Sequence, residues 1–150
     1  MSIPQEYKMR TSARNQLAGV ITSIRDGSVN DEIELQTASG LRVVTTVTRA
    51  SRESMGLNVG TAATALIKAS AVMLVTDAEG MRFSARNQFA GDVTCVRKGA
   101  VNSEILLTLP GGEQLVAIVT NDSAEGLELA MGKRALAMFK AGAAILAVCA

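Results

Sequence analysis

The pentapeptide Ser12-Ala-Arg-Asn-Gln16 recurs unchanged as Ser84-Ala-Arg-Asn-Gln88, and the same offset then holds without a gap to the end of the chain. Over this alignment residues 12–76 match residues 84–148 at about 29 of 65 positions. A repeat of this length is too long for a solenoid and long enough for a small domain. The chain is therefore an internal duplication of one unit. We expect two domains, at residues 10–76 and 82–148.

The composition indicates a core with few aromatic side chains. Of the 150 residues, 48% are hydrophobic but only 3% are aromatic, so Val, Ile, Leu and Ala must fill the interior. A repeat of roughly 65 residues buries only about 60% of its unfolded surface, which leaves it marginally stable alone. We therefore expect the repeats to pack against each other or against other chains, and we expect an oligomer.

Charge and aromatic content argue against nucleic acid as a partner. The net charge is +1 and Lys and Arg form no block, so the chain lacks the basic patch that supplies most nucleic-acid affinity. A nucleic-acid-binding or sugar-binding module needs exposed aromatic side chains as stacking platforms. The chain has only four aromatic residues: Tyr7, Phe83, Phe89 and Phe139.

Neither end of the sequence has the pattern of a targeting or membrane segment. Residues 1–8 lack the basic start and apolar core of a signal peptide, and the apolar tail 141–150 is much shorter than the roughly 20 residues of a membrane helix. Cys95 and Cys149 have no paired spacing, and we expect both to be small buried residues in a reducing compartment. A cytoplasmic protein without a membrane partner is the expectation.

Each repeat predicts the same series of elements. Apolar residues of one parity, as at Val29, Ile33 and Leu35, indicate a half-buried strand. Three strands, a short helix and two further strands are the order of a five-stranded barrel of the oligonucleotide/oligosaccharide-binding (OB) type. We therefore expect an all-β protein with short helices, built as two tandem OB-fold-like barrels. In the first repeat the expected strands are 17–25, 29–37, 41–48, 62–68 and 71–76, and the expected helix is 51–57.

The sequence argues against an enzyme. It contains no His, which excludes His-based acid–base chemistry and His metal ligation. It has no Walker loop, no dinucleotide-binding glycine motif and no Ser nucleophile with a plausible base, so no organic cofactor is expected. The matched acidic pairs Glu32/Glu104 and Glu53/Glu125 are isolated from other matched carboxylates, which favours a solvated face over an acid–base role.

The polar residues shared by both repeats are hydrogen-bond donors: hydroxyls, amides and two cations in each copy. Such a set suits a small tetrahedral oxyanion, because the anion must replace its hydration shell with N–H and O–H donors. Each residue alone also has a structural explanation: Thr48 and Ser51 as helix caps, Arg14 as a surface residue, Lys68 as a solvated strand end. Asn15 and Gln16 are expected to orient their segment through hydrogen bonds to the backbone.

With these motifs the chain resembles the molbindin family, whose domain is also called the Mop or molybdenum-pterin-binding domain and is TOBE-like. The resemblance lies in Ser-Ala-Arg-Asn-Gln-(Leu/Phe)-x-Gly, the Gly-x-Val-Asn turn, Val47-Thr48 with Val119-Thr120, and the Lys-Ala-(Ser/Gly) segment. It covers nearly the whole chain, twice. The family implies OB-like barrels that bind molybdate or tungstate as the ligand.

Carried onto matching positions, the resemblance implies oxyanion contacts in both repeats. It also implies that the Ser-x-Arg segment and the Lys segment of one site come from different repeats. Gly142 occupies the position in the second repeat that Ser70 occupies in the first, so one hydroxyl is missing there. We therefore expect the sites to differ in affinity. The implied contacts are Ser12, Arg14, Thr48, Ser51, Lys68, Ala69 and Ser70, and Ser84, Arg86, Thr120, Ser123, Lys140, Ala141 and Gly142. An additional oxyanion site on a threefold axis is implied at Gly27, Ser28, Val29 and Asn30, with Gly99, Ala100, Val101 and Asn102.

The tandem arrangement resembles the stand-alone members of the family. It implies reversible binding of molybdate for intracellular storage or homeostasis, and a homotrimer, since three chains supply the six barrels of the single-repeat hexamers. An oxyanion-sensing regulatory subunit that acts through a protein partner is the alternative. The sequence does not separate molybdate from tungstate.

Overall fold

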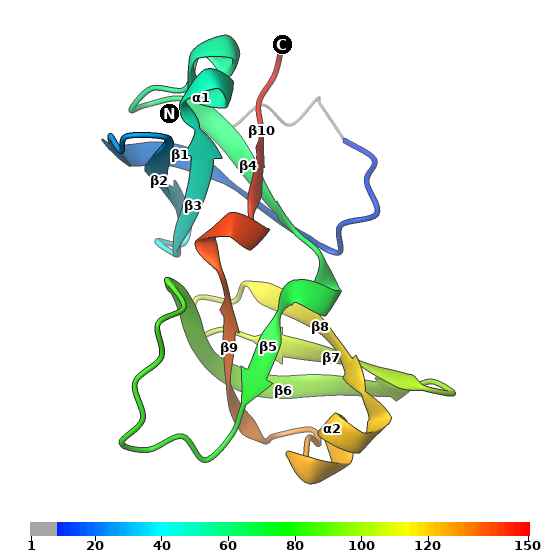
Figure 1. Ribbon diagram of the computed structural model, residues 1–150. Helices are drawn as coiled ribbons and strands as arrows, with labels where there is room; N and C mark the ends of the chain where they lie inside the picture. The colour runs from blue at the N-terminus through cyan, green and yellow to red at the C-terminus, as the bar shows by residue number, and fades with distance from the viewer. Residues whose placement is uncertain (1–8) are drawn as a thin grey trace. The chain divides into compact units, whose positions relative to one another are not determined.

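The structure, a computed structural model, describes residues 9–150 and forms two compact units (Figure 1). Residues 1–8, for which no signal peptide is predicted, lie outside the described residues. Unit 1 consists of the described residues up to Ile67 together with Ala141–Ala150, and unit 2 consists of Lys68–Lys140. The units therefore do not coincide with the two sequence repeats.

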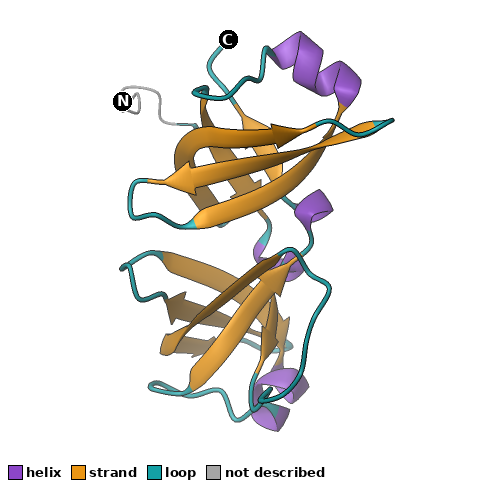
Figure 2. Ribbon diagram, turned by 90° about the vertical axis from the view of Figure 1, so that its left-hand side faces the viewer, coloured by secondary structure: helices purple, strands orange, loops and turns teal. Residues whose placement is uncertain are grey.

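Unit 1 is an antiparallel sheet of five strands in the order β10-β4-β1-β2-β3. Figure 2 shows that the strands, in orange, are curved. The edge strands β10 and β3 come into contact, which closes the sheet toward a barrel. Four strands and the helix come from the first repeat, and the fifth strand comes from the end of the chain. The elements are β1 (Asn15–Arg25), β2 (Asn30–Thr37), β3 (Arg42–Thr48), α1 (Arg49–Met55), β4 (Ala62–Ile67), η2 (Ala141–Ala143) and β10 (Ile145–Ala147).

Unit 2 repeats this architecture with the strand order β5-β9-β6-β7-β8. Its fifth strand, β5, comes from the end of the first repeat, and β5 also contacts β8. The elements are η1 (Ala69–Ala71), β5 (Met73–Val75), β6 (Asn87–Lys98), β7 (Asn102–Thr108), β8 (Gln114–Thr120), α2 (Asn121–Gly126) and β9 (Arg134–Phe139). The predicted fold class, two tandem OB-like barrels with short helices, is confirmed.

The last strand of each repeat pairs with the sheet of the other repeat. The predicted domains, 10–76 and 82–148, do not take account of this exchange. Met73 pairs with Met138 and Ile145 pairs with Leu66, so neither β5 nor β10 folds back on the preceding strand of its own repeat. A tight two-residue hairpin needs residues with positive φ. Residues 68–72 and 140–144 have none, and the 3-10 turns η1 and η2 lead the chain onward instead.

Burial follows the predicted alternation except at the turn before the second strand. Ile33, Leu35 and their counterparts Ile105 and Leu107 are almost completely buried. Val29 and Val101, predicted to share this parity, are 70% and 72% exposed, because each lies in the turn before its strand begins. The prediction that both cysteines are buried is also wrong: Cys149 is exposed and Cys95 is half-buried.

Gly19 lets two backbones approach closely in the core of unit 1. A Cβ at this position would lie 2.4 Å from the carbonyl oxygen of Gln36 on β2. The equivalent Cβ at Gly91 would lie 2.5 Å from the carbonyl oxygen of Thr108. Only glycine fits at either position without separating the two paired strands.

Candidate functional site

The segment that carries the Ser-x-Arg motif is held by the two amides that follow it. Gln88 Nε2 donates to the carbonyl oxygens of Phe83 at 2.9 Å and Ala85 at 2.8 Å. In the first repeat Asn15 Nδ2 donates to the carbonyl oxygen of Ile67 at 3.3 Å, and the Asn15 side chain is buried. The predicted structural role of the Asn-Gln pair is confirmed at these positions, and it fixes the backbone around Ser84.

Arg86 and Lys140 extend from the same end of one strand pair. The β6–β9 ladder begins with Asn87 opposite Phe139, and Arg86 precedes the first of these residues while Lys140 follows the second. Both cations are exposed, whereas Asn87 and Phe139 beneath them are buried. The ladder thus places the Ser-x-Arg segment and the lysine of one repeat next to each other. That one oxyanion site takes these two segments from different repeats stays a prediction.

Thr48 and Ser51 form the N-terminal cap of α1, as the structural explanation predicted. The Ser51 amide donates to Thr48 Oγ1 at 3.1 Å, and Thr48 Oγ1 donates to Ser51 Oγ at 2.9 Å. Thr120 and Ser123 repeat both distances at α2. Because the serine hydroxyl accepts in this arrangement, its own proton is not used in the cap. Capping and oxyanion binding are therefore compatible roles for this pair of residues.

The small-residue segment after each lysine lies against the third strand of the other repeat. In unit 1, η2 packs on β3, and Thr45 Oγ1 donates to the carbonyl oxygen of Ala144 at 2.5 Å. In unit 2, η1 packs on β8. Ala69 and Ala141 are buried, while Ser70 and Gly142 are exposed. Residues of two repeats thus meet within each unit at these segments.

The two groups of predicted donors in unit 2 lie toward opposite ends of β6. Arg86 precedes the first residue of this strand. Thr120 pairs with Asn102 at the start of β7, and the neighbouring Ser103 pairs with Lys98, the last residue of β6. The register therefore brings the arginine and lysine together, and places the capping hydroxyls at another part of the same unit.

Comparison with known proteins places this arrangement in a family. The family model of the TOBE domain matches residues 11–74 and 84–146. The chain belongs to the TOBE domain family. A solved structure of the cytoplasmic molybdate-binding protein ModG with molybdate bound is 38% identical, with a TM-score of 0.90 over 94% of this chain and 100% of that chain. The predicted resemblance to tandem Mop, TOBE-like domains is confirmed.

Curated relatives carry names of transport, binding and regulatory proteins, not of enzymes. The molybdenum transport protein ModE of Herbaspirillum seropedicae is 49% identical over 144 residues, which are 96% of this chain and 54% of that protein. The molybdenum-pterin-binding protein MopA of Rhodobacter capsulatus is 42% identical over 93% of this chain and 53% of its own length. The DNA-binding transcriptional dual regulator ModE of Escherichia coli is 32% identical, over 94% of this chain and 53% of its own length. The chain spans about half the length of these relatives.

The part of the chain that the structure describes contains no cation-binding cluster and no membrane-spanning helix. Within residues 9–150, no three His, Cys, Asp or Glu side chains are placed to hold a metal ion. No helix in the same range is long and apolar enough to cross a membrane.

The turn between the first two strands of each TOBE repeat, where the axis site is predicted, depends on glycine. A Cβ at Gly27 would lie 2.0 Å from the carbonyl oxygen of Asn30, and one at Gly99 would lie 2.8 Å from that of Asn102. The Gly99 amide donates to this Asn102 oxygen at 2.8 Å, whereas the Gly27 amide donates to Asp31 Oδ1 at 3.0 Å. The turn is thus kept in both repeats but is anchored differently.

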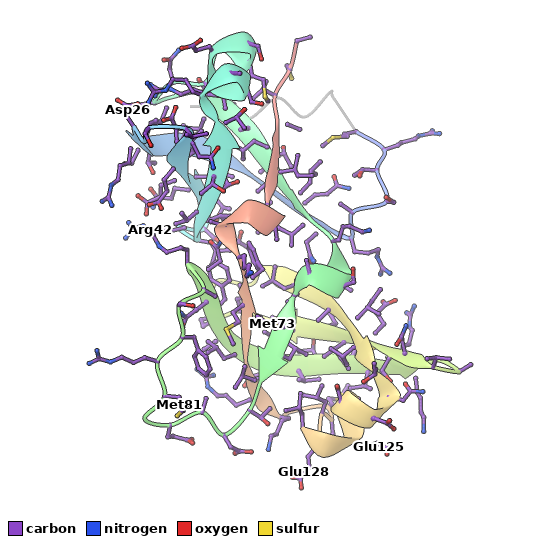
Figure 3. All side chains as sticks on the ribbon, in the orientation of Figure 1. Asp26, Arg42, Met73, Met81, Glu125 and Glu128 are labelled. Atoms are coloured by element: carbon purple, nitrogen blue, oxygen red, sulfur yellow. The ribbon has the colours of Figure 1, made fainter. Side chains whose placement is uncertain are left out.

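A charged network holds this turn in the first TOBE repeat. Asp31 is fully buried, and its two carboxylate oxygens accept from Arg49 at 3.0 Å and from Arg52 at 3.2 Å. Arg49 also donates to the Gly27 carbonyl oxygen at 2.6 Å, and Arg52 pairs with Asp26. Figure 3 shows Asp26 close to α1. The hydrogen bonds from Arg49 and from the Gly27 amide lower the pKa of Asp31 to about 2.

The second TOBE repeat replaces this network with neutral groups. Ser103 stands at the position of Asp31, and Asn121 stands at that of Arg49. Ser103 Oγ donates to Asn121 Oδ1 at 2.6 Å, and Asn121 Nδ2 donates to the Gly99 carbonyl oxygen at 3.0 Å. The charged network was not predicted from the sequence, because its residues are not shared by the two repeats. The signal was the co-occurrence of Asp31, Arg49 and Arg52 in one repeat alone.

We expect this difference to appear as a pH dependence of stability. The folded-state pKa of Asp31 is depressed, so its contribution is fully present above about pH 4 and is lost as the pH falls toward 2. Urea unfolding at pH 4 and at pH 2 checks this against the variant Asp31→Ser/Arg49→Asn/Arg52→Ala, which carries the residues of the second repeat. The wild type should lose more stability over this interval than the variant. Equal losses would contradict the expectation.

Proposed function

We propose that this protein binds molybdate or tungstate reversibly and serves intracellular molybdenum storage and homeostasis. The observation that carries the proposal is the 0.90 TM-score and 38% identity to the molybdate-bound ModG over 94% of the chain, with the donor set present twice. The donors are Ser12, Arg14, Thr48, Ser51, Lys68, Ala69 and Ser70, and Ser84, Arg86, Thr120, Ser123, Lys140, Ala141 and Gly142.

The donor set is large enough for useful affinity. A micromolar Kd corresponds to about −8 kcal/mol. A hydrogen bond to a charged group contributes roughly 1.5–3 kcal/mol, so about five to seven such bonds exceed this value before ordering and desolvation costs. The serine hydroxyls of the helix caps are oriented by hydrogen bonds that the fold already makes. This preorganisation lowers the cost of binding.

Isothermal titration with molybdate, tungstate, sulfate and phosphate tests the proposal. Molybdate and tungstate should bind at micromolar concentrations or below, and with similar affinity, because they are tetrahedral dianions of nearly equal size. Sulfate and phosphate should bind much more weakly. Absence of molybdate binding by the folded protein would refute the proposed function.

Self-association is part of the proposal, and we expect a homotrimer. Arg86 and Thr120 lie toward opposite ends of β6, so a complete donor set needs groups from more than one copy of the barrel. Eight of the nine exposed large hydrophobic residues in the described chain also form pairs at equivalent positions of the two repeats, which indicates a surface that is used twice. These pairs are Met9 with Met81, Val29 with Val101, Val59 with Met131, and Met73 with Ile145.

Light scattering coupled to size exclusion checks the assembly. The trimer of this 15.6 kDa chain should elute as one species. Titration of the trimer should show more than one class of site, because the two repeats differ in several residues around the predicted contacts. A monomer at micromolar concentration would contradict the expected trimer. The identity of the ligand is tested separately, by titration.

The axis site is the second binding position that we propose for the oxyanion. Its residues are Gly27, Ser28, Val29 and Asn30, with Gly99, Ala100, Val101 and Asn102. The exposure of Val29 and Val101, together with the glycine-dependent turn in both repeats, supports the use of this turn as a contact surface.

A sensing role is the second candidate function. Two transcriptional regulators named ModE match at 32% identity, and a molybdenum transport protein of the same name matches at 49%. The chain spans about half of their length. In a sensing role the protein acts in the cytoplasm through a protein partner, and these two units make no contact with nucleic acid. A pulldown with and without molybdate separates the roles: a partner retained only with ligand favours sensing, and none favours storage.

A further inference from the structure

The hydroxyl that Gly142 lacks has a counterpart on the strand against which this residue lies. In the first repeat the position after Lys68-Ala69 is Ser70, and in the second the position after Lys140-Ala141 is Gly142. The strands on which these turns pack show the reverse pattern: the hydroxyl lies on the strand that faces Gly142, and the strand that faces Ser70 has none at the equivalent position. β3 carries Thr46, and the equivalent residue on β8 is Ile118. Each unit therefore contains one hydroxyl at this place, from the turn in unit 2 and from the strand in unit 1.

The geometry of unit 1 brings the Thr46 hydroxyl to the place of the missing side chain. A Cβ built on Gly142 would lie 3.7 Å from Thr46 Oγ1, an ordinary van der Waals distance. The Oγ of a serine at position 142 would extend one bond from that Cβ. The two hydroxyls thus reach the same small region beside the η2 turn.

Thr46 is also free to act as a donor. It is exposed, and alternation along β3 puts its side chain on the same face as that of the capping residue Thr48. Within residues 9–150 its hydroxyl is not engaged in a hydrogen bond. The neighbouring Thr45 is different, because its hydroxyl is buried and donates to the Ala144 carbonyl oxygen.

We propose that Thr46 donates to the oxyanion at the site that contains Gly142, in place of the serine hydroxyl that Ser70 supplies at the other site. This inference rests on the proposed function and deepens it. It replaces the expectation that the Gly142 site has one hydroxyl fewer than the Ser70 site. The two sites then have the same number of hydroxyls, and at the Gly142 site the Thr46 hydroxyl comes from a strand of the other repeat.

Molybdate titration of the assembled protein, with Thr46→Val and Ser70→Ala, tests the proposal. Thr46→Val keeps the shape and removes the hydroxyl, so it should weaken one class of site by about tenfold or more, and Ser70→Ala should weaken the other class. The double variant Thr46→Val/Gly142→Ser should restore the first class, because Gly142 does not have positive φ and has room for a side chain. Thr22→Val, an exposed threonine on β1 that bonds to Glu34, is the matched control and should change neither class.

The outcomes separate this inference from the proposed function. If the wild type does not bind molybdate, the proposed function fails. If the wild type binds and Thr46→Val leaves every class unchanged, or if Gly142→Ser fails to restore binding lost by Thr46→Val, only the role of Thr46 is overturned. Light scattering and circular dichroism on each variant confirm that the change lies in binding and not in assembly or folding.

Discussion

Lys68→Met/Lys140→Met should weaken molybdate binding about ten- to a hundredfold, since each site loses a charged hydrogen-bond donor worth roughly 1.5–3 kcal/mol. Both lysines are exposed and follow buried strand ends, Ile67 and Phe139. Methionine keeps the apolar stem that packs on the barrel, so folding and assembly should survive. Isothermal titration of the assembled variant measures the effect.

The matched control is Lys133→Met/Arg134→Met. It removes the same net charge from the other end of β9, where these residues pair with Asp77 and Asp92. It should leave the affinity nearly unchanged if the effect of the lysines is local. Unchanged affinity in Lys68→Met/Lys140→Met would remove both lysines from the site and leave Arg14 and Arg86 as the matched cations. Equal weakening in both double variants would point to overall charge instead.

Gly19→Ala should be among the most destabilising single methyl additions in this protein. The new Cβ would lie 2.4 Å from the Gln36 carbonyl oxygen, and Cβ atoms do not approach backbone oxygens this closely. Strands β1 and β2 must therefore separate in the core of unit 1. Overpacking of this kind costs about 1–3 kcal/mol of unfolding free energy, and occasionally more. Urea denaturation followed by circular dichroism, at one fixed protein concentration, gives the value.

Gly126→Ala provides the comparison for this experiment. Gly126 lies at the end of α2, its φ is not positive, and a Cβ there would meet nothing within 4 Å. Alanine at this helical position should be neutral or slightly stabilising. If Gly19→Ala has the same unfolding free energy as Gly126→Ala, the close approach of the two strands at Gly19 is disproved.

The elements of the fold could be predicted from the sequence because their signals are local. The alternation of Ile33 and Leu35 placed a strand to within one residue of β2, and Ser51 marked the helix whose cap is Thr48. The order of elements along the chain also indicated the kind of barrel, since three strands, a helix and two strands fit few folds. The donor set emerged by comparison of the repeats, which separated shared polar residues from those that have drifted.

The features that could not be predicted from the sequence depend on how strands distant in the sequence close each barrel. Whether β5 pairs with β4 or with β9 depends on which edge completes a barrel, and residues 68–72 contain the 3-10 turn η1 in place of a hairpin. The same exchange decides that the η2 turn lies on β3, and so that Gly142 meets Thr46. Comparison of the repeats could not reveal the Asp31 network, because its residues occur only once.

The sequence by itself determined the duplication, the kind of barrel and the chemistry of its donors, because repetition, alternation and capping act over a few neighbouring residues. The tertiary structure decided how donors are grouped: Arg86 with Lys140 at one ladder end, and the residues around Gly142 with β3 of the other repeat. The physical reason is that an unpaired strand edge presents N–H and C=O groups that can pair with any strand that reaches it, and a one-dimensional pattern does not say which strand that is.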